Sequence, residues 1–244
     1  LSGDWNLDPR PIVGQPTNSE TFKAIGKKGV LAYVGDSTNA GVAGFSGSES
    51  DVEQGLEKVF KDCEQRVVVT MFASNIGRVI SICKAAEATD RHVAVMGRSL
   101  HRMIGAAKDC GFMDGIKEMI DENDIGLIPR EKLVIIATGS QGEPRAQIAR
   151  IARGDQKNLK LQEGDTVIFS ARPIPGNEKE INFVQNRLAG SGVNVINSRD
   201  TKHVIHVSGH PARDEIKQMY DWLKPQIVVP VHGEKVMIEG QAEL

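Results

Sequence analysis

Residues 66–71 read Arg66-Val67-Val68-Val69-Thr70-Met71, an apolar run that leads into the polar loop Phe72-Ala73-Ser74-Asn75. A helical pattern follows at 75–88, and a second apolar run follows at 92–96. Short apolar runs that alternate with amphipathic helices are typical of parallel strands buried on both faces. This stretch therefore predicts an α/β fold with a mainly parallel sheet and flanking helices.

The same alternation extends through the rest of the chain. We expect one helix to begin at the capping box Ser50-Asp51-Val52-Glu53, and another to bury Ile216, Met219, Tyr220 and Leu223 on one face. The Gly/Ser-rich stretch 41–50 is the best candidate for a domain joint. Further strands are expected at 29–36, 133–137, 166–170, 193–196 and 227–231, and further helices at 100–109, 146–153 and 179–189.

The composition is that of a soluble globular protein. The chain has 244 residues, of which 40% are hydrophobic, enough for one large core or two modest ones. No run approaches the ~20 apolar residues of a membrane helix, and the N-terminus has no signal-peptide pattern, so we expect a cytoplasmic protein without a membrane partner. The net charge of -2 means that nucleic-acid binding must come from local groups. Cys63, Cys83 and Cys110 are expected to be reduced core thiols.

Four of the six histidines fall between residues 203 and 232. Imidazole is a common metal ligand and exchanges a proton near neutral pH, so this grouping is the clearest sign of chemistry in the chain. In 206–210, between a strand-like segment and a helix, Ser208 and Gly209 are expected to offer a hydroxyl and backbone N–H groups to a phosphate at the helix N-terminus. His232 directly follows the strand-like run 227–231, so the sheet would fix its ring as a metal ligand, although a single histidine at a strand end is more often a packing residue.

Ligands of open parallel sheets bind at the carboxyl ends of the strands, where several polar loops fall in this chain. Ser74 and Asn75 follow one expected strand, Arg98 follows a second, and Ser140, in the glycine-rich loop 139–144, follows a third. Each also has a plain explanation: an N-cap for Ser74 or Asn75, a surface charge for Arg98, and a structural turn for the loop. The sequence alone leaves these alternatives open.

Seven short motifs occur in order along the chain. The motifs are Ser2-Gly3-Asp4-Trp5, Gly35-Asp36-Ser37-Thr38-Asn39, Thr70-Met71-Phe72-Ala73-Ser74-Asn75, Gly97-Arg98-Ser99, residues 137–144, His206-Val207-Ser208-Gly209-His210 and Pro230-Val231-His232-Gly233-Glu234. On spacing alone, the first of them, around Asp4, would be read only as a tight turn. Together and in this order the seven are specific, and the chain resembles the ribonuclease J family of β-CASP metallo-β-lactamases over essentially its whole length.

This resemblance implies a role for each residue. Asp4 matches the aspartate that bridges two zinc ions, and His232 matches a ligand to one of them. His210 matches the proposed proton donor to the leaving oxygen, and Asp36, the acidic residue of the first β-CASP motif, would orient it. The segment 206–210 matches the site of the RNA 5′ phosphate. The expected RNA phosphate-binding set is His206, Ser208, Gly209, Ser74, Asn75, Arg98 and Ser140.

The implied function is that of a zinc-dependent ribonuclease with 5′–3′ exonuclease and endonuclease action, and the intact protein is expected to be a homo-oligomer. The family's His-x-His-x-Asp-His loop is expected upstream of Leu1, so we expect this chain alone to bind zinc weakly and to cleave little RNA. Metallo-β-lactamase remnants are expected at 1–46 and 211–244, and a β-CASP domain at 47–210.

Two other functions fit parts of this pattern. A non-catalytic RNA-binding or assembly module of the β-CASP type would use the same loops to grip a phosphate backbone without a metal. A lactamase-like or glyoxalase-like hydrolase fits less well, because those enzymes lack an α/β insert that carries the loop 139–144.

Overall fold

Eight α-helices and seven strands make up the chain, and the computed structural model, which describes residues 1–244, divides them between two units. The outer unit contains residues 1–48 and 207–244, and the inserted unit contains residues 49–206. The chain therefore crosses from one unit to the other twice. Residues 47–48 and 207–210, which the sequence assigns to the β-CASP domain, group here with the outer unit.

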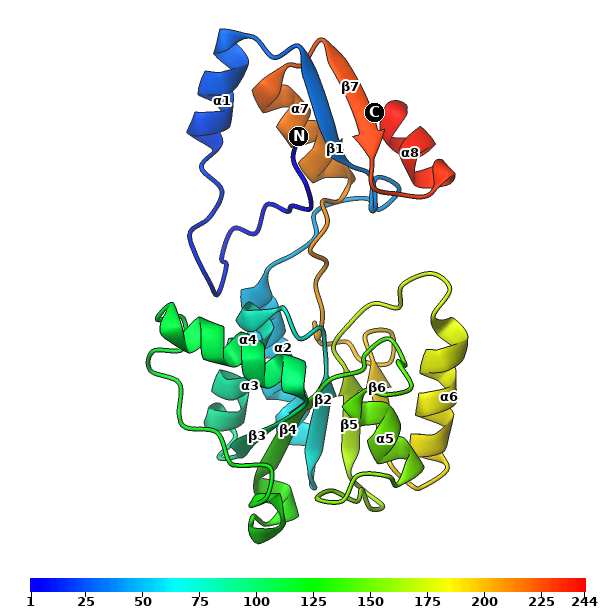
Figure 1. Ribbon diagram of the computed structural model, residues 1–244. Helices are drawn as coiled ribbons and strands as arrows, with labels where there is room; N and C mark the ends of the chain where they lie inside the picture. The colour runs from blue at the N-terminus through cyan, green and yellow to red at the C-terminus, as the bar shows by residue number, and fades with distance from the viewer. The chain divides into compact units, whose positions relative to one another are not determined.

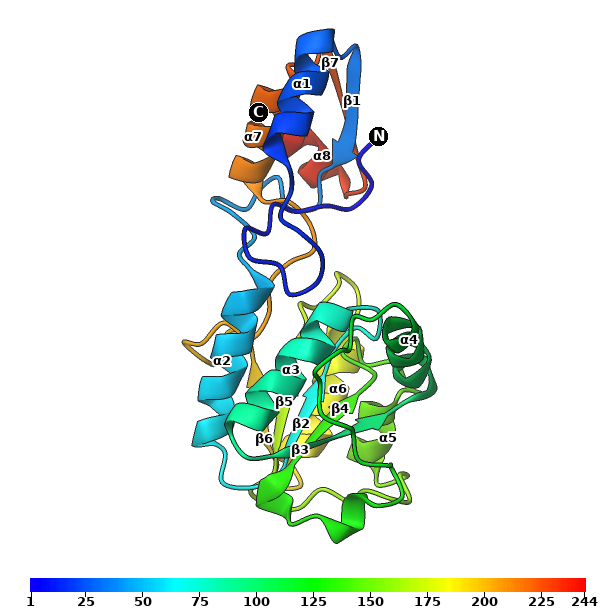
Figure 2. The ribbon, with the colours of Figure 1, turned by 90° about the vertical axis from the view of Figure 1, so that its left-hand side faces the viewer.

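The inserted unit contains a five-stranded sheet in the order β3-β4-β2-β5-β6, in which every neighbouring pair is parallel. Its strands are β2 (Val67–Thr70), β3 (His92–Met96), β4 (Leu133–Ala137), β5 (Thr166–Phe169) and β6 (Asn194–Asn197). Its helices are α2 (Glu49–Asp62), α3 (Ile76–Ala88), α4 (Arg98–Asp109), α5 (Gln147–Arg153) and α6 (Glu178–Ala189). Helices α2 and α3 cover one face, and α5 and α6 cover the other (Figure 1, Figure 2). The predicted α/β class is confirmed.

The core of the inserted unit lies on both faces of this sheet. Every residue of β2, β4 and β5 is buried. On one face, Ile135 and Phe169 belong to a cluster that includes apolar residues of α5 and α6. Two covered faces require continuous apolar runs, which is why these strands show no alternation of polar and apolar residues.

The outer unit is built on only two strands, β1 (Ala32–Asp36) and β7 (Ile227–Val231), which pair in parallel. Helix α7 (Arg213–Leu223) packs against Tyr33 through Met219 and Leu223, and α1 (Ser19–Lys28) packs on α7. Helix α8 (Lys235–Ala242) packs against β7. The pairing of Asp36 with Val231 brings the carboxyl ends of both strands to one edge.

The predicted strands are confirmed to within a few residues, and β3, β4 and β7 match residue for residue. The predicted capping box is wrong, because α2 begins at Glu49 and Ser50 lies inside the helix. Helices α1 and α8 were not predicted. Helix α1 buries no residue fully, and its apolar face is short, with Phe22 and Ile25 as its only large apolar side chains.

The structure shows where the cysteines lie and how long and apolar the helices are. The expectation that all three cysteines lie in the core is wrong, because Cys110 is exposed just after α4, whereas Cys83 is buried and Cys63 is partly buried. No helix is both long enough and apolar enough to cross a membrane.

Candidate metal centre

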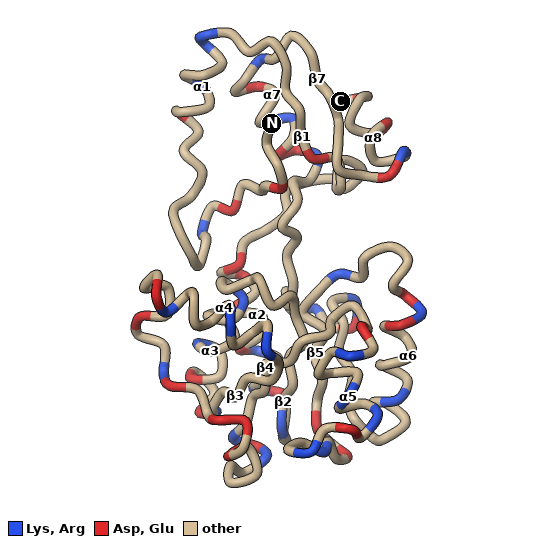
Figure 3. The backbone as a smooth tube through the Cα atoms, in the orientation of Figure 1, with Lys and Arg blue, Asp and Glu red and all other residues tan.

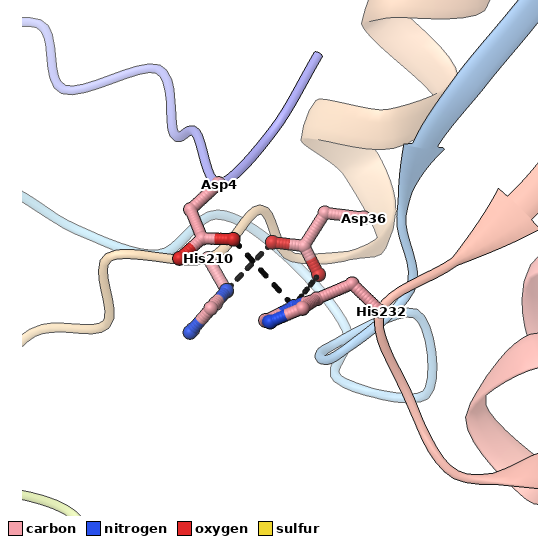
Figure 4. A group of neighbouring side chains, drawn as sticks. All are labelled: Asp4, Asp36, His210 and His232. Carbon is pink, nitrogen blue, oxygen red and sulfur yellow. Dashed lines mark hydrogen bonds and ion pairs between the residues drawn. The ribbon is translucent and has the colours of Figure 1, made fainter. Parts of the chain in front are cut away.

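Four side chains that could hold a metal ion lie together in the outer unit: Asp4, Asp36, His210 and His232 (Figure 4). Each offers one ligand atom, and these atoms all lie within 4.8 Å of one another. They come from the N-terminal segment, the end of β1, the loop before α7 and the position directly after β7. Two carboxylates and two imidazoles at one point form a donor set that suits zinc.

The pairing of β1 with β7 places two of these residues at the same edge. Asp36 is the last residue of β1, and its partner in register, Val231, directly precedes His232. Ser37 reinforces this pairing, because its N–H and its hydroxyl both donate to the Val231 carbonyl, at 2.9 and 2.5 Å. The segment that carries Asp4 is anchored to the same strand by the Ser2 N–H, which donates to the Val34 carbonyl at 3.0 Å.

Asp36 and His210 form the closest pair in the centre. Nδ1 of His210 lies 2.6 Å from Oδ2 of Asp36, whose side chain is fully buried. Burial acts to raise the pKa of Asp36, but hydrogen bonds from His210 and Thr38 outweigh it, so this pKa lies below its ordinary value. The hydrogen bond to Asp36 raises the pKa of His210, although burial opposes it. The charged forms of both groups are therefore favoured.

His232 has an unusual backbone conformation. Its φ of 55° lies in the left-handed region, which costs a non-glycine residue on the order of 1–3 kcal/mol. Its Nδ1 lies 3.2 Å from Oγ1 of Thr38, 3.5 Å from Oδ1 of Asp36 and 3.6 Å from Oδ1 of Asp4. Its ring stacks on that of His210, with 5.3 Å between the ring centroids. Backbone strain at a residue whose ring meets two carboxylates favours a functional role.

Comparison with known proteins shows the family. Residues 64–188 match the model described as "Ribonuclease J, beta-CASP domain", and residues 195–244 match the "Zn-dependent metallo-hydrolase RNA specificity domain". The chain belongs to the ribonuclease J family. Over its whole length it is 49% identical to Ribonuclease J of Sinorhizobium meliloti, 38% identical to that of Synechocystis and 34% identical to Ribonuclease J2 of Bacillus subtilis. It spans 43%, 38% and 43% of these relatives respectively, less than half of each.

Residues 206–210, the segment expected to bind phosphate, have no regular secondary structure. The Ser208 hydroxyl accepts hydrogen bonds from Asn39 Nδ2, at 2.8 Å, and from the His210 N–H, at 3.1 Å, and the Cβ side of Gly209 is open. Ser208 and Gly209 lie between β6 and α7 in the chain, as expected, but they are not at the helix N-terminus, because α7 begins only at Arg213. They lie in the loop that carries His210.

Four other expected phosphate ligands lie in the inserted unit. Ser74 and Asn75 follow β2, Arg98 follows β3, and Ser140 follows β4, so they lie at the carboxyl ends of neighbouring parallel strands. Asn75 caps α3 through Oδ1, Arg98 is exposed, and Ser140 is buried. Lys and Arg residues are mixed with Asp and Glu over this unit (Figure 3), so phosphate binding there depends on local groups.

His206, the last residue of the inserted unit, has a different environment from His210. Burial and the nearby charges of Arg78 and Arg172 lower the pKa of His206 to about 3. The imidazole is therefore neutral at physiological pH. It can offer a phosphate a hydrogen bond, but no charge.

Thr38 organises the centre, although sequence reasoning gave it no role. Its N–H and hydroxyl donate to Oδ1 of Asp36, at 2.8 and 2.6 Å. The same hydroxyl lies 2.9 Å from the backbone carbonyl of His232. Thr38 therefore links the loop after β1 to the residue after β7. Its place two residues after an acidic residue at a strand end was the available signal.

Glu215 was missed for a different reason. Its fully buried carboxylate accepts hydrogen bonds from the backbone N–H groups of Leu7, Ser46 and Ala212, at 2.7, 2.8 and 2.7 Å. It thereby fixes the segment after Asp4 to the start of α7. Its position three residues after the N-cap suits a capping role, but two of its partners are distant in sequence and could not be inferred.

Proposed function

We propose that this chain is part of a zinc-dependent ribonuclease that hydrolyses RNA phosphodiester bonds, both from the 5′ end and internally. The observation that carries the proposal is the convergence of Asp4, Asp36, His210 and His232 in a chain of the ribonuclease J family. The outer unit would be part of a metallo-β-lactamase fold, and residues 47–210 would form the β-CASP domain. We expect the intact protein to be cytoplasmic and homo-oligomeric.

His210 is the proposed proton donor to the ribose oxygen that leaves when the bond breaks. Its Nδ1 is bound to Asp36, so Nε2 is the nitrogen left to face a substrate. Because Asp36 raises the pKa of the imidazole, more of it is protonated near neutral pH. The His210 side chain is 28% exposed, so a substrate can reach it while Asp36 stays buried.

Asp4 and His232 are the proposed zinc ligands. Their side chains are 61% and 57% exposed, so both are open to an ion from solvent. Zinc bound there would stabilise the negative charge that develops on the attacked phosphate. A hydrolytic zinc normally takes three protein ligands, so two should bind it only weakly. Calorimetric titration of this chain with zinc checks this, and tight binding of two ions would contradict it.

RNA would be held through its phosphates. Ser208 and Gly209 lie beside His210 and suit the 5′ phosphate, because one offers a hydroxyl and the other an open backbone. Arg98 would add positive charge, and His206 would add a neutral hydrogen bond. Ser74, Asn75 and Ser140 complete the proposed set.

The test is RNA cleavage by the intact parent protein with zinc. We expect His210→Ala to reduce cleavage by about 10²–10⁴-fold, the usual contribution of a general acid. His101→Ala, which changes an exposed histidine of α4, is the matched control and should leave cleavage unchanged. Full cleavage by His210→Ala would remove the proposed acid. If the intact protein binds RNA but never cleaves it, the non-catalytic RNA-binding module becomes the better explanation.

A further inference from the structure

Arg78, in the first turn of α3, is the largest fully buried side chain in the chain. A buried guanidinium destabilises a fold unless its charge and its donors are satisfied. A cation near a helix N-terminus is disfavoured further by the helix dipole. The candidate metal centre does not use this residue, so its retention in so unfavourable a place needs another explanation.

The guanidinium of Arg78 reaches in two directions. Its Nε and Nη2 donate to the two carboxylate oxygens of Glu49, at 2.9 and 2.7 Å. Its Nη1 donates to the carbonyl and the hydroxyl of Ser170, at 2.9 and 2.6 Å, and lies 3.3 Å from Nδ1 of His206. Arginine has only donors, so Nδ1 of His206 must accept, which leaves the ring proton on Nε2.

Glu49 and His206 are the first and last residues of the inserted unit. One buried side chain therefore binds the point where the chain enters the unit and the point where it leaves. We propose that Arg78 is a clamp that holds the two crossings together, and that it thereby positions the start of the loop 206–210. The proposal does not depend on ribonuclease activity.

Two neighbouring contacts also tie the two crossings together, and a third anchors the leaving segment to the end of β5. A Cβ at Gly55 of α2 would lie 1.9 Å from the Val204 carbonyl oxygen, so the entering helix and the leaving segment are in close backbone contact. The Ser170 hydroxyl donates to the Ile205 carbonyl at 2.6 Å. A Cβ at Gly47 would lie 2.9 Å from Val207. The chain before α2 and the chain that returns toward α7 run side by side in both views (Figure 1, Figure 2).

The energetics favour a geometric role for Arg78 over a stabilising one. Replacing a buried ion pair with apolar side chains of similar volume is often neutral or stabilising, whereas removing one partner is strongly destabilising. The Arg78–Glu49 pair would therefore be dispensable for stability alone. What an apolar pair cannot reproduce is the directed hydrogen bonding to Ser170 and His206, which fixes the leaving segment.

The experiment is measurement of backbone ¹⁵N order parameters by NMR on the full chain. In the wild type we expect values near ~0.85, typical of a rigid backbone, at residues 204–206. In Glu49→Ala these values should fall below ~0.6, because Glu49 holds the Arg78 guanidinium that binds Ser170 and His206. Glu53→Ala is the matched control, because Glu53 lies one turn later in α2 and pairs with Lys84.

A double variant, Arg78→Met with Glu49→Met, tests the same idea without a lone buried charge. We expect it to keep its urea midpoint and to lose order at 204–206, and it carries the test if Glu49→Ala does not fold. Unchanged order at 204–206 in the folded variants would overturn the clamp. Equal loosening by Glu53→Ala would also overturn it, because the effect would then follow from general destabilisation of α2.

Discussion

The inserted and outer units bury their strands to different degrees. In the inserted unit every residue of β2, β4 and β5 is buried, whereas in the outer unit no residue of β7 is buried. The four candidate metal-centre residues nevertheless all belong to the less buried unit. The difference indicates that the residues that stabilise this chain and the residues that carry its chemistry are largely separate sets.

The two units can be followed separately in solution. Both tryptophans and both tyrosines lie in the outer unit, at Trp5, Trp222, Tyr33 and Tyr220. Among Phe, Tyr and Trp, the inserted unit contains only phenylalanine residues. Intrinsic fluorescence therefore reports on the outer unit, while far-UV circular dichroism reports on the helices of both.

The largest expected effect is the loss of core volume in the inserted unit. Ile135, in the middle of β4, is fully buried, so Ile135→Ala should cost about 2–5 kcal/mol through lost burial and a residual cavity. Val229, in β7, is 40% exposed, so Val229→Ala should cost less than about 1 kcal/mol. Urea unfolding followed by circular dichroism and by fluorescence checks both values. Similar losses at the two sites would show that the units do not differ as we infer.

The next effect is a pH dependence of the outer unit, which tryptophan and tyrosine fluorescence reports. The folded-state pKa of His210 lies above its ordinary 6.5, so its contribution to stability is complete below pH 6.5 and is lost as the pH rises through the folded value. The folded-state pKa of Asp36 lies below its ordinary 3.8, so its contribution is complete above pH 3.8 and is lost on further acidification. The fluorescence-detected stability should therefore be greatest between these values.

Asp36→Asn tests the origin of this dependence. It removes a charged hydrogen bond to His210, so we expect a loss of about 1.5–3 kcal/mol at pH 5 and a flatter pH profile. The pKa of His210, followed by NMR, should fall, because burial then acts without the opposing carboxylate. A His210 pKa that stays raised in Asp36→Asn would assign the shift to another group.

The apolar runs allowed the sheet of the inserted unit to be predicted well. A buried strand such as 133–137 can be predicted from its own five residues, because a strand covered on both faces needs an unbroken apolar run. The strand order could not be read in this way, since it depends on contacts between segments far apart in sequence. Helix α1 escaped prediction because it buries no residue and is marked mainly by its Asn18 cap.

The candidate site could be predicted from the sequence only through the order of its motifs. Asp36 and His232 could be placed at strand ends, but nothing local shows that Asp4 lies beside them. Their supporting residues were harder still. Arg78 has the sequence appearance of a surface charge on an amphipathic helix, and only its distant partners, Ser170 and His206, account for its burial.

The smallest expected effects compare two glycines within helices of the inserted unit. At Gly55 an added Cβ would meet the backbone oxygen of Val204 at 1.9 Å, which cannot rotate away, so Gly55→Ala should destabilise the unit by about 1–3 kcal/mol. At Gly105, in α4, nothing lies within 4 Å, so Gly105→Ala should stabilise by about 0.5–1 kcal/mol through its higher helix propensity. Circular dichroism in urea measures both. Opposite signs would show that α2 is closely packed where it meets the leaving chain whereas α4 has room at Gly105, and a gain at Gly55 would mean that the contact with Val204 is loose.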